Sequence, residues 1–210
     1  MNWNNGETPY KIVTDRLVIK CWEPRYAQRL LDEIRATADS LLPWMPFAKP
    51  PLPSVQDEIN LLRLFRGNYD KDLDYVLGIF DPTEEVVIGS TGLHTRRGPH
   101  TLEIGYWIGS SHQGKGYATE TASALIKTAF RLSDVARVEI NTAVDNPKSQ
   151  GVIKKLGIHL EGVVRSAIPD ADGKLHDEQK WSILRGEYEK SVHKDRKLAF
   201  YSATGERLEP

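Results

Sequence analysis

The sequence contains a single cysteine, Cys21, among its 210 residues. One cysteine excludes an internal disulfide and any zinc site built on several thiolates, and it favours a reducing compartment. The sequence also lacks an apolar run near the length of a bilayer span, and it shows no signal peptide. We therefore expect a cytoplasmic protein without a membrane partner.

Neither sign of charge dominates, since 28 lysines and arginines face 29 aspartates and glutamates. No overall field would attract nucleic acid, so no nucleic-acid partner is expected. The six histidines do not stand at metal-ligand spacing, and no metal site is expected. The chain has no Gly-x-Ser-x-Gly elbow, which sets serine hydrolysis aside. With 40% hydrophobic residues, its length suits one compact domain.

The most informative stretch is residues 101–120, TLEIGYWIGSSHQGKGYATE. Its apolar residues first alternate, as in a half-buried strand that ends near Gly109, and they then recur at helical spacing from Ala118 to Phe130. The turn between strand and helix is rich in glycine. It leaves backbone N–H groups and the positive end of the helix dipole open to an anion, so we expect a phosphorylated ligand.

Two common phosphate-binding turns do not fit this spacing. A P-loop requires Ser or Thr after Gly-Lys, whereas Gly116 follows Lys115. A dinucleotide-binding fingerprint requires a third glycine, at the position that Thr119 occupies.

Residues 113–118 instead resemble the Gln/Arg-x-x-Gly-x-Gly/Ala signature of the GCN5-related N-acetyltransferases (GNAT). GYWIG followed by GKGYATE resembles the RimJ/RimL group of that superfamily, and the resemblance covers roughly residues 10–190. It implies acetyl-coenzyme A (acetyl-CoA) as co-substrate and an amine as acceptor. The resemblance assigns the pyrophosphate to a loop made of Gln113, Gly114, Lys115, Gly116, Tyr117 and Ala118.

Local patterns predict the order β-α-α-β-β-β-α-β-α-β-β, an α/β fold with a mixed sheet. The strands are expected at 16–22, 75–80, 86–94, 101–109, 135–144, 160–168 and 175–184. Helices are expected at 24–38, 54–69 and 146–157, with a further helix whose apolar stripe runs from Ala118 to Phe130. We expect residues 1–9 to be a lead-in, 10–188 a single domain, and 189–210 a tail or a dimer-contacting element. The resemblance implies that the central parallel strands, ending at Gly109 and Val144, splay apart.

The resemblance also assigns residues to the acetyl and pantetheine portions of the coenzyme. The backbone around Trp107 and Ile108 is expected to receive them, while Asn146 and Ser149 match an Asn-x-x-Ser motif that faces the coenzyme arm. Asn146 is also a good helix N-cap. Whether it only caps the helix or also contacts the coenzyme arm is left open. In many members of the family, a tyrosine that protonates the departing thiolate stands where this chain has Ile153. The general acid is therefore expected to be Ser149, or there is no dedicated acid.

Attack on a thioester requires a free amine, hence a base. Glu103 is the candidate, because burial in a cleft would raise its pKa; the alternative is a strand glutamate paired with Lys or Arg. Glu120 is second, although the helix dipole explains an acidic residue in a first turn. Trp44, Met45 and Phe47 form either a lip for the acceptor or a hydrophobic plug.

These observations lead to a transfer of acetyl from acetyl-CoA to a primary amine by direct attack. The acceptor is either a protein N-terminal α-amine or a small amine, and the sequence does not choose between them. A non-catalytic acyl-CoA-binding module and an interaction protein that uses only the fold remain as alternatives. The resemblance is also compatible with a homodimer.

Overall fold

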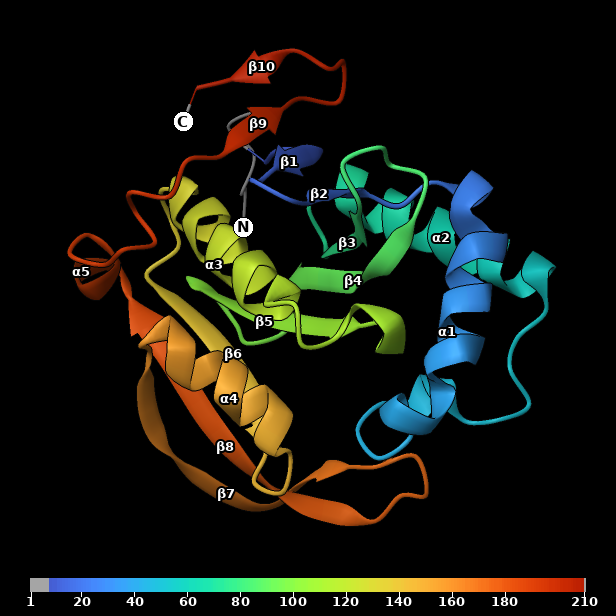
Figure 1. Ribbon diagram of the computed structural model, residues 1–210. Helices are drawn as coiled ribbons and strands as arrows, with labels where there is room; N and C mark the ends of the chain where they lie inside the picture. Colours follow the sequence, from blue (N-terminus) through green and yellow to red (C-terminus); the bar gives the residue numbers. More distant parts are fainter. Residues whose placement is uncertain (1–7, 210) are drawn as a thin grey trace.

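The computed structural model describes residues 8–209 as a ten-stranded mixed sheet with helices on both faces (Figure 1). The strand order is β10-β9-β1-β2-β3-β4-β5-β6-β8-β7, and β5–β6 is the parallel pair among the described strands. The strands are β1 (Lys11–Val13), β2 (Val18–Cys21), β3 (Tyr75–Phe80), β4 (Val87–His94), β5 (Thr101–Ile108), β6 (Arg137–Ala143), β7 (His159–Pro169), β8 (Leu175–Leu184), β9 (Ala199–Tyr201) and β10 (Arg207–Leu208).

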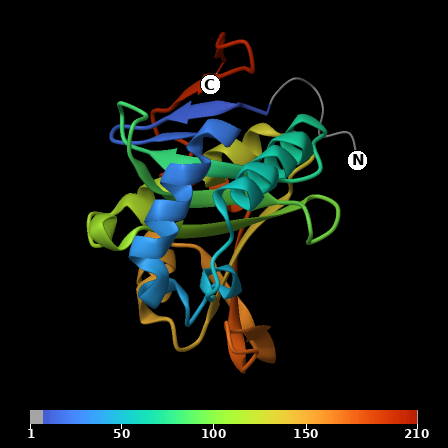
Figure 2. The same cartoon turned by 90° about the vertical axis from the view of Figure 1, so that its right-hand side faces the viewer.

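The main helices lie on opposite faces of this sheet. They are α1 (Ala27–Leu41), α2 (Val55–Asp70), α3 (Tyr117–Arg131) and α4 (Pro147–Leu156), with α5 (Arg185–Tyr188) and three 3-10 turns, η1 (Pro24–Tyr26), η2 (Pro46–Ala48) and η3 (Ser110–His112). Figure 2 shows α1 and α2 in front of the sheet and α3 behind it. Alternation along β5 serves both layers, because Leu102 and Ile104 pack with residues of α3 while Trp107 packs with residues of α1.

Local signals set the boundaries of α2 and α4 as the sequence predicted, whereas the helix expected at 24–38 begins as η1 and continues as α1 to Leu41. Ser54 caps α2 in a reciprocal capping box with Asp57. The Asn146 amide oxygen accepts a hydrogen bond from the Ser149 backbone N–H at 3.0 Å, which confirms the predicted N-cap of α4. Gly157 ends that helix at φ +67°, in the left-handed region that glycine tolerates.

The strand expected at 16–22 is confirmed as β2, whereas β1 was not predicted and the expected last segment needs correction. β1 precedes β2 and pairs with it. The expected tail at 189–210 contains β9 and β10, and β9 pairs with β1. Both errors have one cause, since a strand of two or three residues is too short to show alternation and is defined by a distant partner. The predicted lead-in lies mostly outside the described residues.

The first part of the C-terminal segment is held by a buried histidine. His193 is 3% exposed; its Nε2 donates to the Leu156 carbonyl at 2.8 Å, and its Nδ1 accepts from the Ser123 hydroxyl at 2.8 Å. A carbonyl can only accept, so Nε2 carries a proton, and in the neutral imidazole Nδ1 is then the acceptor. Burial, together with the charge of Arg196, lowers the pKa of His193.

We expect acid to weaken folding through His193. Because its pKa is lower in the folded state, this contribution is complete above the unfolded value of about 6.5 and is lost as the pH falls through the folded pKa. Urea unfolding from pH 7.5 to 5 should show the loss, and His193→Gln should remove that part of the pH dependence. The exposed His159→Gln is the control and should keep it; an identical profile for both variants would contradict the assignment.

Candidate active site

The central parallel strands separate soon after they begin. β5 and β6 pair only from Thr101 to Glu103 with Arg137 to Glu139, and their later residues diverge. The predicted splay is therefore present. It opens into a cavity of about 1,100 Å³, here called the cleft. Its walls come from α1, β5, the loop before α3, β6, α4 and β8, and they include Trp44, Glu103, Tyr106, Gly116, Asn146, Ser149 and His176.

One end of the cleft is the coenzyme loop, residues 113–118. Gly114 and Gly116 have φ of +76° and +83°, which explains why two glycines stand there. The backbone N–H groups from Gly114 to Thr119 donate to no acceptor within the described part of the chain. Six consecutive free donors at the start of α3 suit a diphosphate, and the residues present therefore fit the pyrophosphate of coenzyme A.

The side chains of this loop differ in their contacts with the rest of the cleft. The Gln113 amide donates to the Ile108 carbonyl at 3.0 Å and accepts from the Lys148 ammonium at 3.1 Å, so Gln113 fastens the loop to β5 and α4. Lys115 is exposed and does not line the cleft. Tyr117 and Ala118 line it and pack against a small apolar cluster. The backbone carries more of the expected anion contact than the side chains do.

Strand pairing decides which amides of β5 face the cleft. The Gly109 N–H donates to Ile88 of β4 at 2.8 Å, and in an antiparallel ladder alternate residues point the same way. Trp107 is therefore bonded toward β4, whereas the N–H groups of Tyr106 and Ile108 face the open edge. The backbone around Trp107 and Ile108 therefore offers donors on the open side, and its contact with the coenzyme stays a prediction. The Trp107 side chain is 9% exposed in the core.

Ser149 and Asn146 stand across the splay from β5. The Ser149 hydroxyl lies 3.1 Å from the Tyr106 hydroxyl, and the three residues line the cleft together. Burial raises the pKa of Tyr106 to about 12. Tyr106 thus remains a hydrogen-bond donor at neutral pH. In the sequence, Tyr106 is one residue of an alternating strand, and nothing local shows that its hydroxyl meets a residue 43 positions away.

Glu103 lies in the cleft wall, 6% exposed, between two arginines of the β4–β5 turn. The Arg96 guanidinium donates to its carboxylate at 2.7 Å, and Arg97 donates to the other oxygen. Burial by itself raises the pKa of Glu103, but the hydrogen bonds and charges of these arginines outweigh it, and the net shift is downward. The predicted rise of this pKa is wrong, because sequence alone did not show both guanidinium groups reaching the strand.

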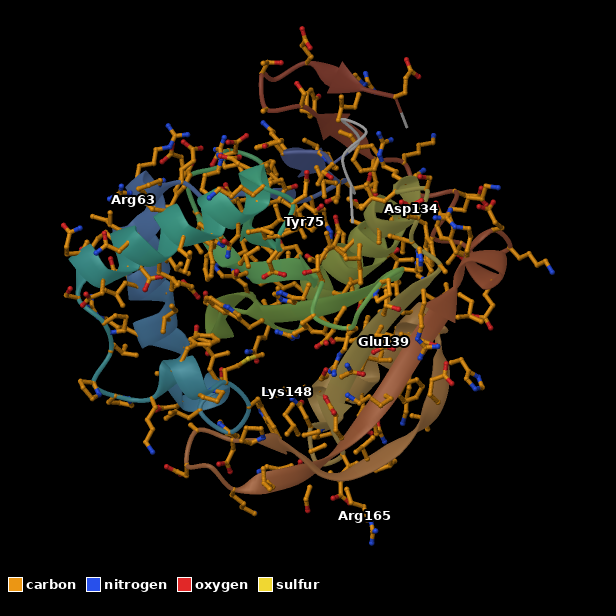
Figure 3. The ribbon with its side chains drawn as sticks, turned by 180° about the vertical axis from the view of Figure 1, so that it is seen from behind. Arg63, Tyr75, Asp134, Glu139, Lys148 and Arg165 are labelled. Carbon is orange, nitrogen blue, oxygen red and sulfur yellow. The ribbon has the colours of Figure 1, made fainter. Side chains whose placement is uncertain are left out.

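Arg97 also approaches two further carboxylates. Its guanidinium lies 3.8 Å from Glu139 and 3.9 Å from Glu178, on the same face of the sheet as Glu103. In the view from behind, Figure 3 shows Glu139 at the sheet, and it shows Lys148 closer to the β7–β8 hairpin. The arrangement is a compact cluster in which one arginine is shared among three acidic residues.

The far end of the cleft is aromatic and acidic. Trp44 and Met45 line it, whereas Phe47 is 47% exposed and its ring centre lies 6.2 Å from that of Trp107. Met45 also packs against the α1 core, which supports the plug, whereas the lip for the acceptor stays a prediction. His176 completes this end, with its ring nitrogens 2.8 Å from Asp145 and 3.0 Å from Asp170. Hydrogen bonds to Asp170 and Asp145 raise the pKa of His176.

Neither metal nor membrane features appear in the described residues. Across residues 8–209, no three His, Cys, Asp or Glu side chains come together as a metal site would require. No helix in the same range combines the length and hydrophobicity needed to cross a bilayer.

Comparison with known proteins gives a consistent result. A family model described as an acetyltransferase (GNAT) domain matches residues 16–159. The [ribosomal protein uS5]-alanine N-acetyltransferase of Escherichia coli is 29% identical over 177 residues, covering 80% of this chain and 87% of that protein. The structure of the ribosomal L7/L12 α-N-protein acetyltransferase RimL with coenzyme A superimposes with a TM-score of 0.73 at 19% identity, covering 82% and 96%. The acetyltransferase MccE with acetyl-CoA and AMP gives 0.75 at 23%, covering 86% and 99%.

Proposed function

From the premise that the chain belongs to the GNAT acetyltransferase family, as an acetyl-CoA-dependent N-acetyltransferase close to the RimJ/RimL enzymes, we propose that its acceptor is a protein N-terminal α-amine. The observation that carries this proposal is that one cavity of about 1,100 Å³ is lined both by residues of the coenzyme loop and by Trp44, Met45 and His176. The cleft therefore has room for an extended chain end beside the coenzyme.

Ribosomal proteins are the acceptors we propose first, because enzymes named for them cover most of this chain. The acidic groups beside His176 support a positively charged chain end. Asp145 and Asp170 lie 2.8 and 3.0 Å from the ring nitrogens of His176, and they raise its pKa. An incoming ammonium would meet a favourable potential there.

The chemistry divides among a few groups. Acetyl-CoA bound along the loop supplies a thioester, and the amine nitrogen attacks its carbonyl carbon while the carbon–sulfur bond breaks. We propose that Glu103 receives the amine proton, directly or through water, and that the Ile108 N–H stabilises the oxygen that becomes negative. Ser149, itself hydrogen-bonded to Tyr106, stands where its hydroxyl can stabilise the departing thiolate.

Acceptor class can be tested with three kinds of amine. We expect thiol release from acetyl-CoA with short peptides that begin with a free alanine or serine. Peptides of the same sequence with a blocked N-terminus and one internal lysine should give only background release, as should small amines. Release from the blocked lysine peptides or from small amines at a comparable kcat/KM would contradict an α-amine acceptor while leaving acetyl transfer intact.

A further inference from the structure

Arg16, from the turn between β1 and β2, lies against the coenzyme loop although 99 positions separate it from Lys115. Its Nη1 donates to the Lys115 carbonyl at 2.9 Å, and its guanidinium carbon stands 4.8 Å from the centre of the Tyr117 ring. No sequence motif of the loop includes this residue. The contact is made to the backbone of the segment that presents free N–H groups.

The Arg16 side chain is fixed from the other side by Glu120. Its Nε donates to a carboxylate oxygen of Glu120 at 2.8 Å, Nη2 lies 2.6 Å from the same oxygen, and the Arg16 backbone N–H reaches the second oxygen at 3.1 Å. Glu120 is 5% exposed and also accepts from the Thr14 hydroxyl at 2.6 Å. This carboxylate was the second candidate for the base, but unlike Glu103 it does not line the cleft. A planar, forked guanidinium held this way has little freedom.

The hydrogen bond to Lys115 sets the orientation of one peptide group. In a trans peptide the C=O and the following N–H point in opposite directions. Since the Lys115 carbonyl points toward Arg16, the Gly116 N–H points away from it. Gly116 lines the cleft, whereas Arg16 does not. The N–H is therefore directed toward the side where a diphosphate is to be bound.

We propose that Arg16 is a positioning residue for the pyrophosphate of coenzyme A: it fixes the Lys115–Gly116 peptide and does not itself contact the phosphates. The Glu120–Arg16–Lys115 connection joins the β1–β2 turn to the loop, so the anion site is preorganised by a segment outside the glycine signature. Preorganised donors spare the loop the entropy of ordering when coenzyme A binds.

Three variants test this role by calorimetry with coenzyme A. We expect Arg16→Gln to weaken binding about tenfold, the effect of losing one charge-assisted hydrogen bond. Arg16→Lys should lose nearly as much, because an ammonium cannot hold Glu120 and the Lys115 carbonyl in one fixed geometry. Arg29→Gln is the control. It breaks an exposed ion pair between Arg29 of α1 and Glu85, and it should bind coenzyme A normally. Full affinity in Arg16→Lys would overturn the proposal, since charge alone would then suffice.

Dephospho-coenzyme A, which lacks the 3′-phosphate, separates positioning from direct contact. Arg16→Gln should weaken both ligands by the same factor, and in steady-state assays it should raise the KM for acetyl-CoA with little change in kcat. An effect confined to the ligand with the 3′-phosphate would assign Arg16 to that phosphate and overturn the proposal.

If a variant does not fold, the proposal can still be tested on the native chain. Hydrogen exchange of the Gly116 amide should slow when coenzyme A is added. An unchanged rate at Gly116, with slowing at the neighbouring amides, would overturn the proposal. The calorimetric and hydrogen-exchange readouts do not depend on which amine is the acceptor.

Discussion

Replacing Gly116 by valine should raise the KM for acetyl-CoA about 100-fold or more. Gly116 has φ of +83°, a region that costs ordinary residues roughly 1–2 kcal/mol and a β-branched residue more. The loop relieves this strain by rotating its backbone, and the rotation turns away the N–H groups on both sides of the residue. Two charge-assisted hydrogen bonds, each worth about 1.5–3 kcal/mol, account for an effect of that size.

Gly205 supplies the matched control for that prediction. It has φ of +81° in the turn between β9 and β10, and like Gly116 it leaves room for a side chain. Gly205→Val should therefore lower the melting temperature by a similar amount while the KM for acetyl-CoA stays normal. If Gly116→Val bound coenzyme A as the native chain does, the loop would not be the anion site.

Replacing Glu103 by glutamine should lower kcat about 100-fold, within the range expected for removal of a general base. The KM for acetyl-CoA should change little, because Glu103 lies on the strand and not on the coenzyme loop. Glu139→Gln removes the same charge from the same cluster beside Arg97 and is the control. If the two variants lost activity equally, Glu103 would act through the charge of the cluster and not as a base.

The pH profile of the same reaction should reflect the effect of Arg96 and Arg97 on the pKa of Glu103. Because Arg96 and Arg97 lower the pKa of Glu103, its carboxylate stays ionised at neutral pH, and its protonation should reduce kcat/KM only below its ordinary value of about 4.3. Arg97→Gln removes one of the two charges, so the acid limb of the profile should move to higher pH. A limb that stays in place in this variant would exclude Glu103 as the group that titrates.

The segment from β5 through the coenzyme loop to α3 was predictable from sequence. Period-two alternation, glycines where positive φ is required, and helical spacing of apolar residues are all read within residues 101–130. The N-cap at Asn146 and the hairpin of β3 and β4 were predictable for the same reason, since each depends on neighbours in the chain. The family resemblance came from this local signal too.

Contacts between distant positions required the tertiary structure. Tyr106 meets Ser149, Arg16 meets Glu120, and His176 meets Asp145 through side chains 43, 104 and 31 positions apart. Even the arginines seven and six positions before Glu103 escaped prediction, because a turn decides whether they face the strand. Periodicity indicates which face a residue occupies, whereas the sign of a pKa shift depends on which charged atoms reach it. The sequence thus determined the coenzyme loop and the element order, and only the packing of the elements decided the electrostatics of the site.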